Sequence, residues 1–99
     1  MNMQSIMAQA QKLQRDITKK KNEIDATIFE GKSEWVEAKF NGKKELVSFK
    51  LLYEGTIGED DKEVLEDMVS IALKDAFGKI DKEIEDKLGS YGSSLNGLF

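Results

Sequence analysis

The stretch EWVEAKFNGKKELVSFKLLY, residues 34–53, predicts a β-hairpin and so decides the fold class. Val36, Ala38 and Phe40 alternate with polar neighbours, which is the two-residue period of a half-buried strand. Asn41-Gly42 follows, a dipeptide typical of hairpin turns. The apolar run ELVSFKLLY, residues 45–53, then supplies the returning strand.

Loop length decides which side chains face each other across this hairpin. A two-residue loop would set apolar residues of the first strand opposite charged residues of the second. A four-residue loop, residues 41–44, instead pairs Ala38 with Val47 and Val36 with Phe49. We prefer the longer loop because it places apolar partners together on one face.

A long helix is predicted before the hairpin, followed by a short first strand, ATIFEG, residues 26–31. Apolar residues return at alternating steps of three and four from Met3, which indicates an amphipathic helix. The helix spans about 23 residues and is therefore roughly 35 Å long. The apolar positions are Met3, Ile6, Ala10, Leu13, Ile17 and Ile24.

A second long helix is predicted after the hairpin. Asp60 and Glu63 resemble a capping box, and the helical pattern runs from there to about Leu88. Its first half has a wide apolar arc, which suits packing on a sheet, and its second half has a narrow seam, which needs only one helical neighbour. The arc contains Val64, Leu65, Met68, Val69, Ala72, Leu73, Ala76 and Phe77, and the seam Ile80, Ile84 and Leu88.

These elements predict an α+β protein with the order α-β-β-β-α, a three-stranded antiparallel sheet and two long helices. Residues 1–88 form a single domain. Residues 89–99 contain three Gly and three Ser without periodicity, so we expect a flexible tail. Its apolar residues Leu95, Leu98 and Phe99 could dock elsewhere.

The element lengths favour a homodimer. A seven-residue strand is only about 23 Å long, whereas the second helix reaches about 42 Å, so both helices overhang the sheet. A chain of 99 residues also buries only about 60–65% of its unfolded surface. We expect a second copy to cover apolar residues at an interface that includes Trp35, Val36, Phe40, Val47, Phe49 and Leu51.

Composition excludes several classes of function. The chain has no His and no Cys, which removes Ser–His and Cys–His nucleophiles, disulfides and thiolate metal sites. No Gly-rich phosphate loop is present, since Gly42-Lys43-Lys44 belongs to a hairpin turn. No apolar run approaches the ~18 residues of a membrane span. We therefore expect a soluble, cytoplasmic protein that is not an enzyme and has no cofactor.

An acidic cluster opens the second helix, at Glu59, Asp60, Asp61 and Glu63. Oxygen ligands suit hard cations, but the alternate acids, central Gly and distal Glu of an EF-hand loop are absent. Acids in a first turn also stabilise the helix dipole without any ion. We interpret the cluster as a helix start and expect no metal.

Charge is unevenly spread along the chain. Residues 1–22 carry +4, residues 23–55 carry −2 and residues 56–99 carry −6, within a total of −4. The distribution predicts a basic limb on an acidic body. Lys12, Arg15 and Lys19 share a stripe away from the apolar seam, Lys20 and Lys21 follow, and Gln9, Gln11 and Gln14 lie on the remaining faces.

Two readings of the basic limb remain. Its cations could neutralise nucleic-acid phosphates while the glutamines bond to sugars or base edges, or they could be ordinary surface charge. Trp35 and Phe29 could in principle stack on single-stranded bases. Trp35 shares a face with Glu37 and Lys39, however, so core or dimer packing explains it better.

The sequence also resembles the YbaB/EbfC family of bacterial nucleoid-associated proteins. Met7-x-Gln9-Ala10-Gln11-Lys12-Leu13-Gln14 is similar to the family's first-helix signature. Leu65-Glu66-Asp67-Met68 followed by Ala72-x-x-Asp75-Ala76 is similar to its second-helix signature. Phe40-Asn41-Gly42 stands where that family turns its central hairpin.

The resemblance implies a tweezer-like homodimer whose helix ends form prongs. It also implies low-specificity binding of double-stranded DNA, a location in the nucleoid, and a role in nucleoid organisation and gene expression. The implied contacts are Lys12, Arg15, Lys19, Lys20 and Lys21, with Gln9 and Gln11, and secondarily Lys79, Lys82 and Lys87. The alternative is an acidic dimeric interaction module that serves a recombination or replication protein.

Overall fold

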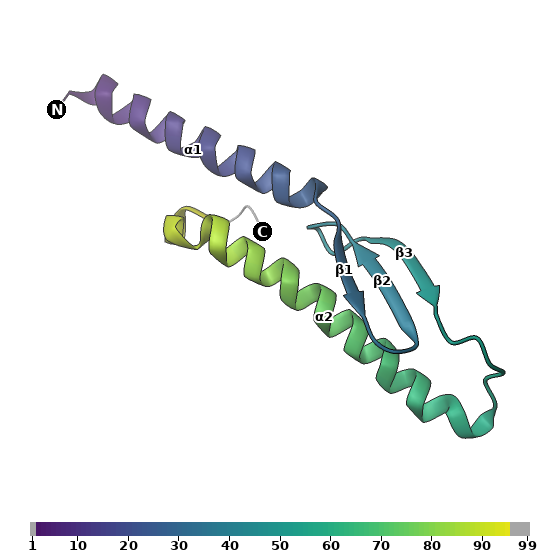
Figure 1. Ribbon diagram of the computed structural model, residues 1–99. Coiled ribbons are helices and arrows are strands. Elements are labelled where there is room, and N and C mark those ends of the chain that lie inside the picture. The colour runs from purple at the N-terminus through teal and green to yellow at the C-terminus, as the bar shows by residue number, and fades with distance from the viewer. Residues whose placement is uncertain (1, 96–99) are drawn as a thin grey trace.

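A computed structural model describes residues 2–95 of the chain and confirms the α-β-β-β-α order (Figure 1). Two long helices flank a single three-stranded sheet. The elements are α1 (Met3–Ala26), β1 (Phe29–Lys32), β2 (Val36–Phe40), β3 (Leu46–Leu51), the 3-10 turn η1 (Glu59–Asp61), α2 (Lys62–Leu88) and the 3-10 segment η2 (Gly89–Leu95).

Helix α1 has 24 residues, close to the predicted length, with a defined start and end. The Asn2 side chain accepts the Ser5 backbone N–H at 2.8 Å, which satisfies one of the unpaired donors of the first turn. At the other end, Thr27 donates its backbone N–H to the carbonyl of Ile24 and its hydroxyl to that of Glu23. Ala26 therefore belongs to α1, and β1 begins later than the apolar run suggests.

The sheet has the order β1-β2-β3 and is antiparallel throughout. Val36, Ala38 and Phe40 are buried on the face that α2 covers, as the alternation in sequence predicts. Helix α2 packs against β1 and β2. β3 lies at the edge, and every one of its residues is exposed.

The predicted strand register was wrong by two residues. Ala38 pairs with Phe49 and Val36 with Leu51, because the loop has five residues and a bulge at Val47 adds one more to β3. The Asn41 side chain fixes the five-residue loop: its Oδ1 accepts the N–H groups of residues 43 and 45 at 2.9 and 3.1 Å. Phe49 and Leu51 remain on the face of Val36 and Ala38, but Leu46 rather than Val47 completes that face, opposite Phe40.

The predicted capping box was also wrong. Residues 59–61 form a 3-10 turn ahead of α2, and the Asp61 carboxylate accepts the backbone N–H of Gly58 at 3.0 Å. Asp60 does not cap α2, because it lies inside the 3-10 turn that precedes the helix. Asp61 occupies the N-cap position of α2 instead. The acids remain in the first turns of the helical segment, where they favour its dipole.

The core follows the middle and the C-terminal half of α2. Gly31 lies so close to α2 that a methyl group there would overlap the carbonyl oxygen of Ala72 and lie 2.7 Å from the Ala76 Cβ. Phe77 meets Phe40 edge-on, with ring centroids 4.8 Å apart. Further along, Ile80 and Leu88 join Ile17 and Ile24 of α1 in one buried cluster. Of the predicted sheet-facing arc, Ala72, Ala76 and Phe77 lie against the strands, whereas Val64 at its start is 39% exposed.

The molecule is elongated, at 70 × 19 × 18 Å with a radius of gyration of 19.3 Å. A compact domain of this length would have a radius near 13 Å. Helices α1 and α2 lie antiparallel, and the first half of α1 projects beyond the end of α2 (Figure 1). Residues 2–16 are all exposed.

The segment after α2 begins with η2 and brings Tyr91 back against the core cluster. The sequence assigns these residues to a flexible tail. Of the apolar residues expected to dock from that tail, Leu98 and Phe99 lie outside the described residues.

Candidate nucleic-acid interface

Three cations share one face of α1, with Lys12 and Arg15 on its projecting part and Lys19 just beyond the buried Ile17. Lys12, Arg15 and Lys19 are exposed, and their spacing of three and four places them on the side away from the buried Ile17 and Ile24. Within residues 2–95 none of the three makes an ion pair. We call these three residues the basic face. It spans about 10 Å along the helix.

The Lys20 side chain contacts Tyr91 of η2 and is not part of the basic face. Its Nζ donates a hydrogen bond of 2.8 Å to the Tyr91 hydroxyl and lies 5.0 Å from the centre of that ring. The hydrogen bond to Tyr91 raises the pKa of Lys20 above its ordinary 10.5, with smaller help from Asp16 and Glu23 and against partial desolvation. Lys20 therefore ties α1 to η2 and remains protonated at neutral pH.

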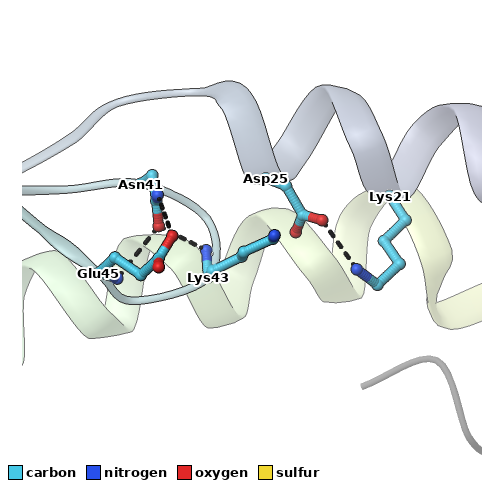
Figure 2. Close-up of polar contacts among 5 residues, drawn as sticks. All are labelled: Lys21, Asp25, Asn41, Lys43 and Glu45. Atoms are coloured by element: carbon cyan, nitrogen blue, oxygen red, sulfur yellow. Dashed lines mark hydrogen bonds and ion pairs between the residues drawn. The ribbon is translucent and has the colours of Figure 1, made fainter.

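Lys21 is also engaged. It pairs with Asp25 at 2.8 Å one turn along α1, beside the β2–β3 hairpin (Figure 2). The Gly42 backbone N–H donates to the Asp25 carbonyl at 3.3 Å, and within the turn the Asn41 Nδ2 donates to Glu45 at 2.8 Å. Of the five predicted α1 cations, the structure thus separates the three on the basic face from two with protein partners.

The polar residues near the tip of α1 are accessible. Gln9, Gln11 and Gln14 are all exposed on its projecting part. Their amides could donate to and accept from a ligand that the basic face holds.

The secondary candidates on α2 differ among themselves. Lys82 is exposed and makes no ion pair within the described part of the chain, whereas Lys87 lies 3.8 Å from Glu83. Lys79 donates to the Glu30 carbonyl at 2.7 Å and lies 3.4 Å from Asp75. These bases are interspersed with acids, so α2 offers a weaker positive field than α1.

Sequence reasoning missed two cations near this region. Lys43 and Lys44 in the hairpin turn line a groove of about 530 Å³ together with Lys21, Asp25 and Asp81. Lys44 pairs with Asp81 at 3.0 Å and adopts a left-handed backbone, with φ of 65°. The sequence signal is Gly42-Lys43-Lys44, which was assigned to a hairpin turn rather than to a phosphate loop.

Charge is segregated along the molecule. Several bases of the body are neutralised locally, for example Lys44 by Asp81 at 3.0 Å and Lys62 by Glu59 at 3.0 Å. Residues 12–23 carry five bases against two acids, Asp16 and Glu23, and Glu23 lines a pocket together with Arg15 and Lys19. The field of the basic face is therefore positive despite the negative total charge.

The predicted dimer residues fall into two groups. Val47, Phe49 and Leu51 on β3 are about half exposed, and Leu46, which the sequence analysis omitted, is 59% exposed. Val36 and Phe40 are buried by α2 within the single chain and have almost no surface left to offer.

The sixth predicted dimer residue, Trp35, stacks on Tyr53. The two ring centroids are 4.3 Å apart and the planes meet at 28°. Both side chains are half-buried, so they form a small aromatic contact beside the sheet.

The described part of the chain gives little support to other kinds of site. Among residues 2–95, no three His, Cys, Asp or Glu side chains are arranged to hold a metal ion. No helix in that range is both long and apolar enough to cross a bilayer.

Sequence comparisons with known proteins point to one family. A family model described as the YbaB/EbfC DNA-binding family matches residues 1–95. The chain is 40% identical over 100 residues to a nucleoid-associated protein of Ligilactobacillus salivarius, covering 99% of this chain and 95% of that protein. It is 41% and 42% identical over 97 residues to nucleoid-associated proteins of Streptococcus equi subsp. zooepidemicus and Lactococcus lactis subsp. cremoris, covering 96% of this chain and 97% of each.

Proposed function

The chain belongs to the YbaB/EbfC DNA-binding family, and we propose that it is a homodimeric nucleoid-associated protein that holds double-stranded DNA on the basic face of α1. The bacterial nucleoid is its proposed location, and nucleoid organisation with an effect on gene expression its proposed role. The relatives named as nucleoid-associated proteins support this assignment.

The observation that supports it best is a set of cations without protein partners on a projecting helix. Lys12, Arg15 and Lys19 make no ion pair within residues 2–95, so a phosphate would not have to displace a carboxylate from them. Each phosphate that they neutralise releases condensed counterions, which favours binding and makes it depend on salt. The acidic body lies away from this face and repels the phosphates of the duplex. This repulsion directs the DNA to α1.

Low sequence preference follows from the same geometry. Lysine contacts to phosphate position a protein on DNA without reading its sequence. The exposed amides of Gln9, Gln11 and Gln14 add hydrogen bonds to sugar or phosphate, and any base preference would come from them.

A second copy would complete the interface through β3. This edge strand exposes backbone N–H and C=O groups as well as Leu46, Val47, Phe49 and Leu51, which is the surface that edge pairing or face packing would cover. Twofold pairing there presents two copies of the basic face to one duplex. Once one basic face binds the duplex, the second is held close to the same DNA at a high effective concentration. The dimer therefore binds more tightly than either α1 alone.

A salt series on the purified full chain tests this function. If each α1 neutralises three or four phosphates, the logarithm of duplex affinity should fall with the logarithm of salt at a slope of roughly −5 to −7 for the dimer. Fluorescence anisotropy of labelled duplex measures it. Absence of binding at low salt would contradict the proposal and favour the acidic interaction module for a recombination or replication protein.

A further inference from the structure

An apolar stripe runs along the projecting half of α1 with nothing packed on it in the described chain. We call Met3, Ile6, Met7, Ala10 and Leu13 the N-terminal stripe; Met3 is 73% exposed, and the other large members are 40–55% exposed. It continues the seam in which Ile17 and Ile24 are buried against α2. The stripe remains uncovered because α1 extends past the end of α2 (Figure 1).

The spacing of this stripe fits another helix. Its members recur at steps of three and four, and the same seam already receives helix α2 one turn further along, at Ile17. A helical occupant would therefore extend a packing mode that the molecule uses elsewhere.

Charge identifies which helix fits. Residues 3–14 carry one charged side chain, Lys12, and it points away from the stripe. A strongly acidic or basic partner helix, or a duplex, would find no matching charge there. An uncharged apolar stripe of the same kind, as on a second copy of this chain, meets no such penalty.

An antiparallel twofold arrangement of two copies is self-complementary. It sets Met3 against Leu13 of the second copy and Ile6 against Ala10, so large residues are distributed evenly along the contact. Lys12 points away from this contact and lies level with Gln4 of the second copy, not with its lysine. The two helix dipoles also oppose each other, which is the favourable orientation.

We propose that the N-terminal stripe is a self-association surface that joins one dimer to another through antiparallel pairing of their α1 tips. The inference rests on the proposed function for its biological setting, because the basic face on the same helix places these tips at the DNA. Joined tips would link two DNA-bound dimers and so hold two duplex segments together.

The contact is small and therefore reversible. Eleven residues of helix are about 16 Å long, and half of such a cylinder presents on the order of 250 Å² per copy. A stable interface uses about 800 Å² per partner. Tip pairing should thus be weak for isolated dimers and effective where DNA aligns many of them.

A charge-neutral variant separates this surface from DNA contact. Ile6→Gln combined with Leu13→Gln removes apolar surface, preserves charge and keeps good helix formers. The matched control is Ile28→Gln combined with Val64→Gln, which alters exposed apolar residues elsewhere, at 51% and 39% exposure. All three full-length proteins would be compared with and without DNA.

Sedimentation equilibrium without DNA gives the first readout. Wild type and control should pass from dimer to tetramer as concentration rises, whereas the stripe variant should require at least tenfold more protein. Equal association of all three proteins, or none in any of them up to millimolar concentration, would overturn the proposal. This readout does not depend on whether the protein binds DNA.

Capture of a labelled duplex by a bead-tethered duplex gives the second readout. The stripe variant should bind a single short duplex within twofold of wild type yet lose at least tenfold in capture. Undiminished capture would overturn tip pairing. Failure of wild type to bind the short duplex would instead count against the proposed function.

Discussion

Gly31 shows how strictly one residue can be determined by packing. A Cβ at this position would overlap the α2 backbone at Ala72, and that backbone cannot move without disturbing the core. We predict that Gly31→Ala lowers the free energy of unfolding by about 3 kcal/mol or more. Gly78→Ala is the control: it meets no atom within 4 Å in mid-helix and should stabilise by about 1 kcal/mol. Urea denaturation of both variants measures the contrast, and equal effects would contradict it.

The Lys20–Tyr91 contact makes a prediction about pH. Because the folded-state pKa of Lys20 is raised above 10.5, the contact adds stability that is fully present below that pH and is lost as the pH rises through the folded value. Tyr91→Phe should shift the pKa of Lys20 back toward 10.5, since it removes the hydroxyl acceptor. An NMR titration of the lysine side chains follows this, with Tyr53→Phe as a control that leaves Lys20 unchanged. An unaltered pKa in Tyr91→Phe would exclude the hydroxyl as its cause.

At this scale the sequence located the cations but not their partners. Lys12, Arg15 and Lys19 could be grouped from helical spacing alone, because three and four residues complete one turn. Lys20 shares their stretch of sequence, yet its partner Tyr91 lies 71 positions away. Only the tertiary fold brings that hydroxyl to α1, so no local pattern could separate Lys20 from its neighbours.

At the scale of elements, the two halves of α1 differ in packing: the second half packs against α2, and the first half is exposed. Ile17 is fully buried against the α2 cluster, whereas Ile6 belongs to the projecting half and is 47% exposed. At low micromolar concentration we predict that Ile17→Ala destabilises by about 2–5 kcal/mol. Ile6→Ala, the same chemical change on the same helix, should cost less than about 1 kcal/mol. Thermal or urea unfolding checks the difference, and comparable losses would mean that the tip is packed in the free protein.

For the sheet, the sequence predicts which residues of β2 are buried but not how β2 pairs with β3. Alternation fixed which residues of β2 face the core, and Val36, Ala38 and Phe40 are buried accordingly. The pairing with β3 depended instead on the Asn41 side-chain bonds and on a bulge at Val47. Neither feature produces a periodic pattern in the sequence. The predicted register was therefore wrong by two residues, and Leu46 rather than Val47 shares the face of Phe49.

At the scale of the whole molecule, the exposed β3 residues lead to a prediction about assembly. Phe49→Asp should convert the proposed dimer into a monomer, because a carboxylate would be buried without a partner at the interface. Ile28→Asp introduces the same charge at a residue of similar exposure beyond the opposite sheet edge and should leave the dimer intact. Sedimentation velocity distinguishes the two. A dimeric Phe49→Asp protein would move the interface away from β3.

The separation of charge along the molecule underlies the proposed function. The basic face begins on the projecting half of α1 and reaches Lys19, just beyond the buried Ile17, while paired lysines and excess acids occupy the body. Duplex binding by a chain of net charge −4 is then a matter of local field rather than total charge.

The duplex affinity of a charge-reversed basic face, compared with that of an equal reversal elsewhere, tests the role of this local field. The combined Lys12→Glu, Arg15→Glu and Lys19→Glu variant should lose at least a hundredfold in affinity at low salt and most of the salt slope. The control reverses Lys32, Lys62 and Lys74, which lie on β1 and on α2 away from the tip, and changes net charge by the same amount. We expect the control to stay within about tenfold of wild type. Equal losses in the two variants, or wild-type affinity in the first, would contradict DNA binding by the basic face.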